Sequence, residues 1–281
     1  MAAMDWLGLA GRNCIVTGAG GGIGSMVART FAEAGARLVL LDRDRAACER
    51  TAAALNKSGA ETLAIECDVA DPASVTAAAE RATASVGPAD VLINNAGMLR
   101  AGPLATLSSA EWNAMLAVNL TGYFLCAQAF GRAMLARGRG AIVHIASIAA
   151  RHPQPFSGAY SVSKAGVVML SEQLALEWGP QGVRSNAVSP GLVRTPMSEA
   201  FYQAPGVSER RAAIVPTRRI GTPTDMAEAA AFLASDRAQY INGENVTVDG
   251  GFGRVLMGLV PRPGYDQADH ASPNVKRGDQ G

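Results

Sequence analysis

The chain has 281 residues, of which 48% are hydrophobic and 17% charged, and its 25 Lys and Arg residues against 24 Asp and Glu residues give a formal net charge of +1. This balance is typical of a globular protein with a sizeable core, and it argues against nucleic acid or a membrane surface as partner. The N-terminus lacks a signal-peptide core, and no uninterrupted apolar run approaches the roughly 18 residues of a membrane span, so we expect a cytoplasmic protein.

Short apolar runs alternate with longer Ala-rich stretches along the chain. The stretches Asp44–Lys57 and Ala73–Val86 suit helices, and Asp71 followed by Pro72 is a typical helix start. The alternation predicts an α/β fold of the Rossmann type, a doubly wound parallel sheet with helices on both faces. The seven predicted strands are Asn13–Thr17, Arg37–Leu41, Thr62–Glu66, Val91–Asn94, Ala141–Ala146, Arg184–Val188 and Asn245–Val248.

No linker separates these strands, so residues 1–253 are predicted to form one dinucleotide-binding and catalytic domain. Residues 191–221 form a long connection after the sixth strand, and its apolar residues predict a lid that closes over bound substrate. Residues 254–281 form a C-terminal extension, in which the apolar stretch Val255–Val260 should pack on a neighbouring subunit or on its own subunit.

Cysteines and histidines give no sign of a metal site. Cys14, Cys48, Cys67 and Cys126 form no Cys-x-x-Cys pair, and the three histidines show no metal-ligand spacing. We expect the cysteines to be small buried side chains in a reducing compartment, and we expect no bound metal.

The first predicted strand runs directly into TGAGGGIG, Thr17 to Gly24, which an apolar-periodic helix follows. Glycines in such a turn let the backbone approach a pyrophosphate, and the free N–H groups of the helix start can bind it. The second strand is followed by Asp42, 18 residues past Gly24, where a carboxylate can bind the adenosine ribose and repel a 2′-phosphate. Arg43 could instead accept a phosphate, but no basic residue interrupts the glycine loop, so NAD is the predicted cofactor.

A candidate acid/base group follows the fifth strand. Tyr160 and Lys164 are four residues apart and share one face of a helix, and Ser147 ends the apolar segment IVHIAS. A nearby ammonium can lower the pKa of a tyrosine from about 10 toward a useful range, and a serine hydroxyl can hold a substrate oxygen. The three residues predict an alcohol dehydrogenase that needs no metal.

These motifs, in this order, resemble those of the short-chain dehydrogenase/reductase family, in its compact branch, from about residue 9 to residue 252. TGAGGGIG is similar to the family's TGxxxGxG, and Asn94–Gly97 is similar to its NNAG signature. The thirteen residues from Ser147 to Tyr160 also match the family pattern. The segments SPGLVRTPM and INGENVTVDGG resemble its nicotinamide-binding segment and its closing strand.

The resemblance implies a catalytic set of Asn119, Ser147, Tyr160 and Lys164. Tyr160 would exchange a proton with the substrate oxygen, which Ser147 orients. Lys164 would bind the nicotinamide ribose and lower the pKa of Tyr160, and Asn119 would distort its helix and hold a water in a proton relay. The implied cofactor residues are Gly18, Gly20, Gly21, Gly22, Ile23, Gly24, Asp42, Arg43, Asp68, Val69, Asn95, Ala96, Gly97, Tyr160, Lys164, Pro190, Gly191, Val193 and Thr195.

The predicted function is therefore the transfer of a hydride between NAD(H) and a secondary alcohol or ketone, by a homotetramer or a dimer. The candidate substrate residues are mostly apolar or aromatic, which favours a hydrophobic or cyclic substrate. They are Met98, Ala149, His152, Phe156, Met197, Phe201 and Tyr202.

Four other functions are weighed against this one. An enoyl reductase would space its Tyr and Lys more widely, and a sugar-nucleotide epimerase or dehydratase would need a larger C-terminal domain. A non-catalytic dinucleotide sensor or scaffold would tend to lose Ser147, Tyr160 or Lys164. An NADPH-dependent 3-oxoacyl thioester reductase stays open as an alternative, because the substrate is not evident from the sequence.

Overall fold

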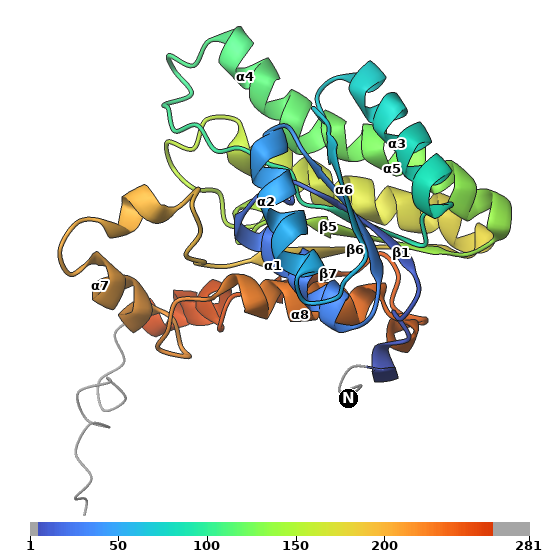
Figure 1. Cartoon of the computed structure of the whole chain (residues 1–281). Coiled ribbons are helices and arrows are strands. Elements are labelled where there is room, and N and C mark those ends of the chain that lie inside the picture. The colour runs from blue at the N-terminus through green and yellow to red at the C-terminus, as the bar shows by residue number, and fades with distance from the viewer. Residues whose placement is uncertain (1–4, 261–281) are drawn as a thin grey trace, which may run out of the picture.

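The computed structural model describes residues 5–260, which form a seven-stranded sheet with helices on both faces (Figure 1). The strand order is β3-β2-β1-β4-β5-β6-β7, and all neighbouring strands pair in parallel. The fold class is confirmed, and every strand ends within two residues of its predicted bounds. The strands are β1 Asn13–Thr17, β2 Arg37–Asp42, β3 Thr62–Glu66, β4 Val91–Asn94, β5 Gly140–Ile145, β6 Val183–Pro190 and β7 Asn245–Val248.

Two apolar cores lie on opposite faces of the sheet, because successive strand residues point to opposite sides. Cys14 and Val16 belong to one core, whereas Ile15 belongs to the other. The first core is covered by α1 (Gly22–Glu33), α2 (Arg45–Asn56) and α8 (Pro223–Ala234). The second core is covered by α3 (Pro72–Val86), α5 (Gly122–Arg137) and α6 (Tyr160–Trp178). The two short helices are α4 (Ser109–Leu116) and α7 (Val207–Ile214).

Local signals set the helix starts. The Asp71 side chain accepts a hydrogen bond from Ala73 N, and Pro72 occupies the first turn of α3, as its sequence predicts. Asp44 caps α2 in the same way, through Ala47 N. All four cysteines are buried and unpaired, as expected, and burial raises the pKa of Cys48 and of Cys67 to about 11.

The chain crosses the sheet after β3 to place β4 beside β1, so the direction of winding reverses between these two strands. In open parallel sheets, ligands bind outside the carboxyl ends of the strands at such a reversal. The loops after β1, β4, β5 and β6 therefore meet along one edge, and the predicted motifs occupy these loops.

The continuous helical stretch Ser109–Arg137 is long and apolar enough to cross a membrane, by length and composition only. The sequence did not predict this stretch, because polar residues such as Asn113, Asn119 and Gln128 interrupt its apolar runs. Core helices of globular proteins meet the same criteria. Cys126, Phe130 and Met134 of this stretch are buried in the core, so we interpret it as a core helix.

The predicted lid, residues 191–221, is a folded segment. It contains a 3₁₀ turn at Glu199–Tyr202 and the helix α7, and a backbone bridge between Val193 and Gly221 closes its base. Figure 1 shows this segment extending to one side of the sheet.

The first part of the predicted C-terminal extension is a 3₁₀ helix, Phe252–Leu259. Leu256 and Leu259 are each 73% exposed, so this apolar stretch is not buried against its own subunit. Packing on a neighbouring subunit stays a prediction, and residues 261–281 lie outside the described residues.

Candidate active site

A cleft of about 920 Å³ follows the carboxyl edge of the sheet, at the upper end of the size range of ligand pockets. Its walls come from the loops after β1, β2, β3, β4, β5 and β6 and from the predicted lid. The predicted cofactor residues that line it are Gly18, Gly21, Gly22, Ile23, Asp42, Arg43, Asp68, Val69, Asn95, Ala96, Gly97, Tyr160, Lys164, Pro190, Gly191, Val193 and Thr195.

Gly20 and Gly24 do not line the cleft but shape the glycine loop that does. A Cβ atom on Gly24 would lie 2.1 Å from Gly18 O, which no side chain tolerates. Gly18 has a φ of +65°, and a Cβ there would lie 2.8 Å from Ala96 Cα. The loop is thus packed tightly under the start of α1, whose free N–H groups favour an anion, and the site fits a pyrophosphate.

Asp42 marks one end of the cleft. Its Oδ2 accepts a hydrogen bond from Gly20 N at 2.8 Å, and its Oδ1 accepts one from Asp44 N at 2.9 Å. These two backbone donors fix the carboxylate beside the glycine loop, where a ribose would lie. Arg43 is exposed and lines the same end, so a cation is also within reach.

Lys164 lies on α6, buried beneath the centre of the cleft. Its Nζ donates a hydrogen bond to Ile145 O at 2.8 Å and one to Tyr123 Oη at 3.1 Å. One N–H of the ammonium is left for another acceptor. Burial lowers the pKa of Lys164 to about 7, because a charged ammonium is poorly solvated there.

Tyr160 begins α6, with the Lys164 Nζ 6.0 Å from its ring centre. Burial raises the pKa of Tyr160, and a hydrogen bond with Ser147 acts in the opposite direction. The protein's own groups therefore hold the phenol protonated. The predicted lowering of its pKa depends on the positive charge of an oxidised nicotinamide in addition to the ammonium.

Asn119 lies in a π-helical turn, Ala117–Thr121, between α4 and α5, in agreement with the implied helix distortion. Its Oδ1 accepts a hydrogen bond from Met98 N at 2.8 Å, and its Nδ2 donates to Met98 O at 2.9 Å and to Ser163 Oγ at 3.1 Å. The side chain thus fixes the loop after β4. The implied water relay stays a prediction.

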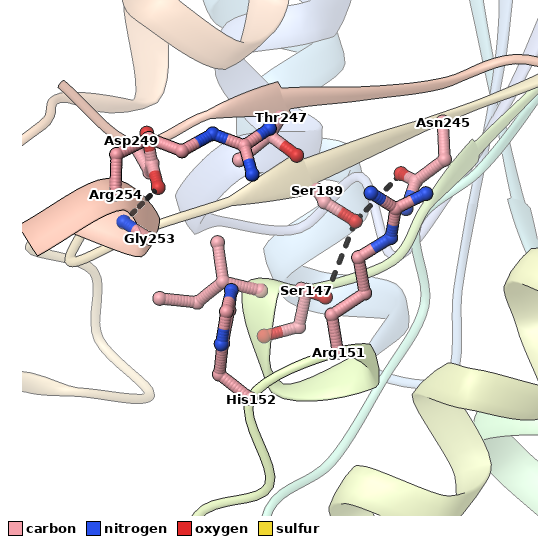
Figure 2. A pocket seen from close by; sticks show the side chains of 10 residues that line it. Ser147, Arg151, His152, Ser189, Asn245, Thr247, Asp249, Gly253 and Arg254 are labelled. Atoms are coloured by element: carbon pink, nitrogen blue, oxygen red, sulfur yellow. Dashed lines mark hydrogen bonds between the residues drawn. The ribbon is translucent and has the colours of Figure 1, made fainter. Parts of the chain in front are cut away.

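Ser147 is held from the neighbouring strand β6, which is bonded in turn to β7 (Figure 2). Its backbone oxygen lies 3.2 Å from Ser189 Oγ, which in turn lies 2.7 Å from Asn245 Oδ1. Its own Oγ accepts a hydrogen bond from Ala149 N at 3.1 Å. Figure 2 also shows Arg151 beside the small pocket behind this serine.

The substrate end of the cleft is lined by six of the seven predicted substrate residues. The exception is Phe156, which is 72% exposed and does not line the cleft. Its backbone oxygen accepts a hydrogen bond from Gly102 N, and with a φ of +57° the ring turns to solvent. The six residues in place are Met98, Ala149, His152, Met197, Phe201 and Tyr202.

Some residues of the site were not predicted. Tyr123 contacts Lys164 and donates its hydroxyl to Ile145 O at 2.9 Å, and its position four residues after Asn119 could have indicated it. Its ring stacks on His144, which burial keeps neutral by lowering its pKa to about 3. Gln154 and Arg211 also line the cleft, with no sequence signal that marks them.

No group of three or more His, Cys, Asp or Glu side chains within residues 5–260 could hold a metal ion. Ser147, Tyr160 and Lys164 line the same cleft as the glycine loop. This combination of fold and site defines a nicotinamide-dinucleotide-dependent oxidoreductase.

Comparisons with known proteins agree with this class. A family model described as enoyl-(acyl carrier protein) reductase matches residues 18–253. The chain belongs to the short-chain dehydrogenase/reductase family, and its relatives oxidise or reduce alcohols.

Two curated relatives are 43% identical to this chain. D-threitol dehydrogenase of Mycolicibacterium smegmatis aligns over 87% of this chain and 94% of its own length. Galactitol 2-dehydrogenase (L-tagatose-forming) of Cereibacter sphaeroides aligns over 87% and 96%. Among solved structures, a gluconate 5-dehydrogenase of Burkholderia cenocepacia, in complex with NADP and tartrate, is 36% identical with a TM-score of 0.85, over 89% of this chain and 98% of that chain.

Proposed function

We propose that this enzyme is an NAD-preferring dehydrogenase that oxidises a secondary hydroxyl group of a small polyol to a ketone, and catalyses the reverse reduction. The Asp42 carboxylate carries the choice of cofactor. It is fixed by Gly20 N and Asp44 N at the place where a ribose 2′-hydroxyl could donate to it, and a 2′-phosphate would be repelled. Arg43 beside it supports the opposite choice, and the solved relative with bound NADP makes the test necessary.

Ser147, Tyr160 and Lys164 would each have a separate role in the oxidation of the alcohol. In oxidation, Tyr160 Oη would take the proton of the substrate hydroxyl, while Ser147 Oγ binds the same oxygen. Lys164 would hold the cofactor ribose with its remaining N–H and favour the phenolate through its charge. The nicotinamide supplies the hydride acceptor when it is bound.

Two observations support a polyol as substrate. The relatives at 43% identity are named for threitol and galactitol, and polar side chains, among them His152 and Gln154, line the substrate end of the cleft. The hydrophobic or cyclic substrate that the sequence favours is the second candidate. It is supported by Met197, Phe201 and Ile214 in the lid and by a 36% identical 3beta-hydroxysteroid dehydrogenase 1 of Eggerthella lenta.

Steady-state kinetics with each cofactor test the proposal. We expect kcat/KM to favour NAD over NADP by roughly tenfold to a hundredfold, the worth of one hydrogen bond to a charged group. The substrate panel would contain threitol, galactitol, cyclic alcohols and a hydroxysteroid. A preference for NADP would overturn the cofactor assignment. If only the cyclic alcohols or the steroid were oxidised, the assignment of a polyol as substrate would be overturned.

We also propose a cytoplasmic homo-oligomer, a tetramer or a dimer. Large apolar side chains are exposed on two helices of one face: Phe124 on α5 and Met169 and Leu176 on α6. Such a patch fits a subunit contact. The four unpaired cysteines fit a reducing compartment. Light scattering on the purified protein would give the number of subunits.

A further inference from the structure

The lid presents a cation to the cleft. Arg211 lies on α7, is half-buried and lines the cleft. Its guanidinium carbon lies 4.7 Å from the ring centre of Tyr202 and 5.4 Å from that of Phe201. Contact with two aromatic rings restricts the guanidinium while its N–H edges stay able to bind an acceptor.

Among residues 5–260, no carboxylate balances the charge of Arg211. The guanidinium carbon of Arg194 lies 5.6 Å from the centre of the same Tyr202 ring. Arg194, however, donates two hydrogen bonds, of 2.9 and 2.6 Å, to the Glu199 carboxylate. Arg211 makes no ion pair with any carboxylate in the part of the chain that the structure describes. A half-buried guanidinium that faces a cleft without a counter-charge favours an anionic ligand.

The Tyr202 hydroxyl is a second donor without a partner. Tyr202 is only 6% exposed, and its buried Oη has no hydrogen-bond partner among residues 5–260. Buried hydroxyl groups almost always have a partner, and Tyr202 lines the cleft. The Oη is covered in this structure, so a small movement of the residue 191–221 segment would let a ligand oxygen held by Arg211 reach both donors.

The position of α7 places these donors at the substrate end. Val215 and Pro216, directly after α7, pack on Gly250 and Gly251. Gly253, two residues after Gly251, lies beside His152. His152 belongs to the segment that follows Ser147. Arg211 is one helical turn before Val215, whereas Asp42 and the adenosine-binding residues come from the loops after β2 and β3.

We propose that Arg211 and Tyr202 form a carboxylate-binding subsite, so that the preferred substrate is a polyhydroxy acid rather than an uncharged polyol. The inference rests on the proposed function, since it specifies the substrate of the same cleft. A carboxylate would accept hydrogen bonds from two N–H groups of the guanidinium and from the phenolic O–H. The carbon chain of the substrate would then extend toward Ser147 and Tyr160, with a hydroxyl-bearing carbon beside them.

Matched pairs of ligands test the subsite without the need for turnover. An aldonate and the alditol of the same length and configuration, such as D-mannonate and D-mannitol or D-ribonate and ribitol, differ only at one terminal carbon. Binding to the enzyme–NADH complex would be measured by calorimetry, and kcat and KM with NAD would be measured for each pair. We expect the aldonate to bind at least about tenfold more tightly than its alditol, the lower end of the worth of a hydrogen bond to a charged group.

Three variants assign the effect to its atoms. Arg211→Gln should remove the preference for aldonate, mainly through KM, because aldonate binding should weaken more than alditol binding. Tyr202→Phe should reduce the preference by about threefold to tenfold, because one neutral donor is lost. Arg210→Gln is the matched control: Arg210 lies on the same helix but is exposed and does not line the cleft, so this variant should behave as the wild type.

Each remaining outcome overturns one statement. If wild-type enzyme binds aldonates no better than alditols, the subsite does not exist. If Arg211→Gln weakens NADH binding and leaves the aldonate preference unchanged, Arg211 binds the cofactor pyrophosphate and the inference is wrong. If the aldonate preference is present and depends on Arg211 while no polyhydroxy compound is oxidised, the subsite stands and the proposed polyol oxidation fails.

Discussion

The two ends of the cleft are built in different ways. At the Asp42 end and in the centre, the groups lie at the carboxyl ends of strands or on α6. Backbone atoms at the edge of the sheet or in its loops fix them, as Ile145 O fixes Lys164 and Gly20 N fixes Asp42. At the substrate end, the lid supplies Met197, Phe201 and Ile214, each at least 39% exposed. We infer from this comparison that the sheet edge and α6 determine the chemistry, whereas the predicted lid selects the substrate.

The largest loss of activity is expected from a substitution at the centre of the cleft. Tyr160→Phe removes only the hydroxyl, so folding and NAD binding should survive, while kcat should fall roughly a hundredfold to ten-thousandfold. Stopped-flow rates of cofactor reduction would measure the loss, and NADH fluorescence titration would serve as the control. Retention of most of the activity would mean that another group exchanges the proton.

An intermediate effect is expected at the adenosine end. Asp42→Ala removes the proposed ribose acceptor and the negative charge, so the preference for NAD over NADP should shrink by about tenfold or more. The ratio of the two kcat/KM values is the measurement. Asp44→Ala offers a control, because Asp44 caps α2 and does not line the cleft. An unchanged ratio in Asp42→Ala would assign cofactor choice to other residues.

A smaller effect is expected beneath the centre. Tyr123→Phe removes an acceptor that stabilises the Lys164 ammonium, whose pKa burial has already lowered to about 7. The pKa of Lys164 should fall further, so the alkaline limb of the kcat/KM profile should move to lower pH, with about a threefold to tenfold loss at neutral pH. Tyr160, Cys126 and His144 are further titratable groups beside Tyr123, and His144 is kept neutral by burial and should not contribute. An unshifted profile would show that Tyr123 has only a packing role.

The smallest effect is expected at Phe156. Since its ring faces solvent and Gly102 holds its backbone, Phe156→Ala should change kcat/KM by less than about twofold, as surface substitutions usually do. Phe201→Ala is the contrasting variant, because Phe201 lines the cleft and contacts Arg211. If the two variants changed kcat/KM equally, Phe201 in the predicted lid would contribute no more to substrate binding than the surface residue Phe156.

The sequence predicted what local patterns encode. Strand periodicity, the glycine turn and the spacing of Tyr160 and Lys164 are properties of neighbouring residues, and all of them agree with the structure. Tyr123 was missed because its role arises from a contact with Lys164, which lies 41 residues away in the chain. Arg211 was missed because its helix was not predicted. Phe156 was placed wrongly because its backbone pairs with Gly102, more than fifty residues away.

The helix α7 was also not foreseen. Its eight residues are too few for helical periodicity to stand out from the surrounding loop. The sequence therefore predicted a lid in this segment, but it predicted neither the helix α7 nor the position of Arg211 on it.

The central claim is that this enzyme transfers a hydride from a secondary carbinol carbon to NAD. An alditol or aldonate that carries deuterium at its secondary carbons would be incubated with the enzyme and NAD, and the reduced cofactor would be analysed by mass spectrometry. We expect NADH that contains one deuterium per ketone formed, and at least about a hundredfold less of it with Tyr160→Phe over the same time. Reduced cofactor without deuterium, or a ketone formed without reduced cofactor, would contradict the claim.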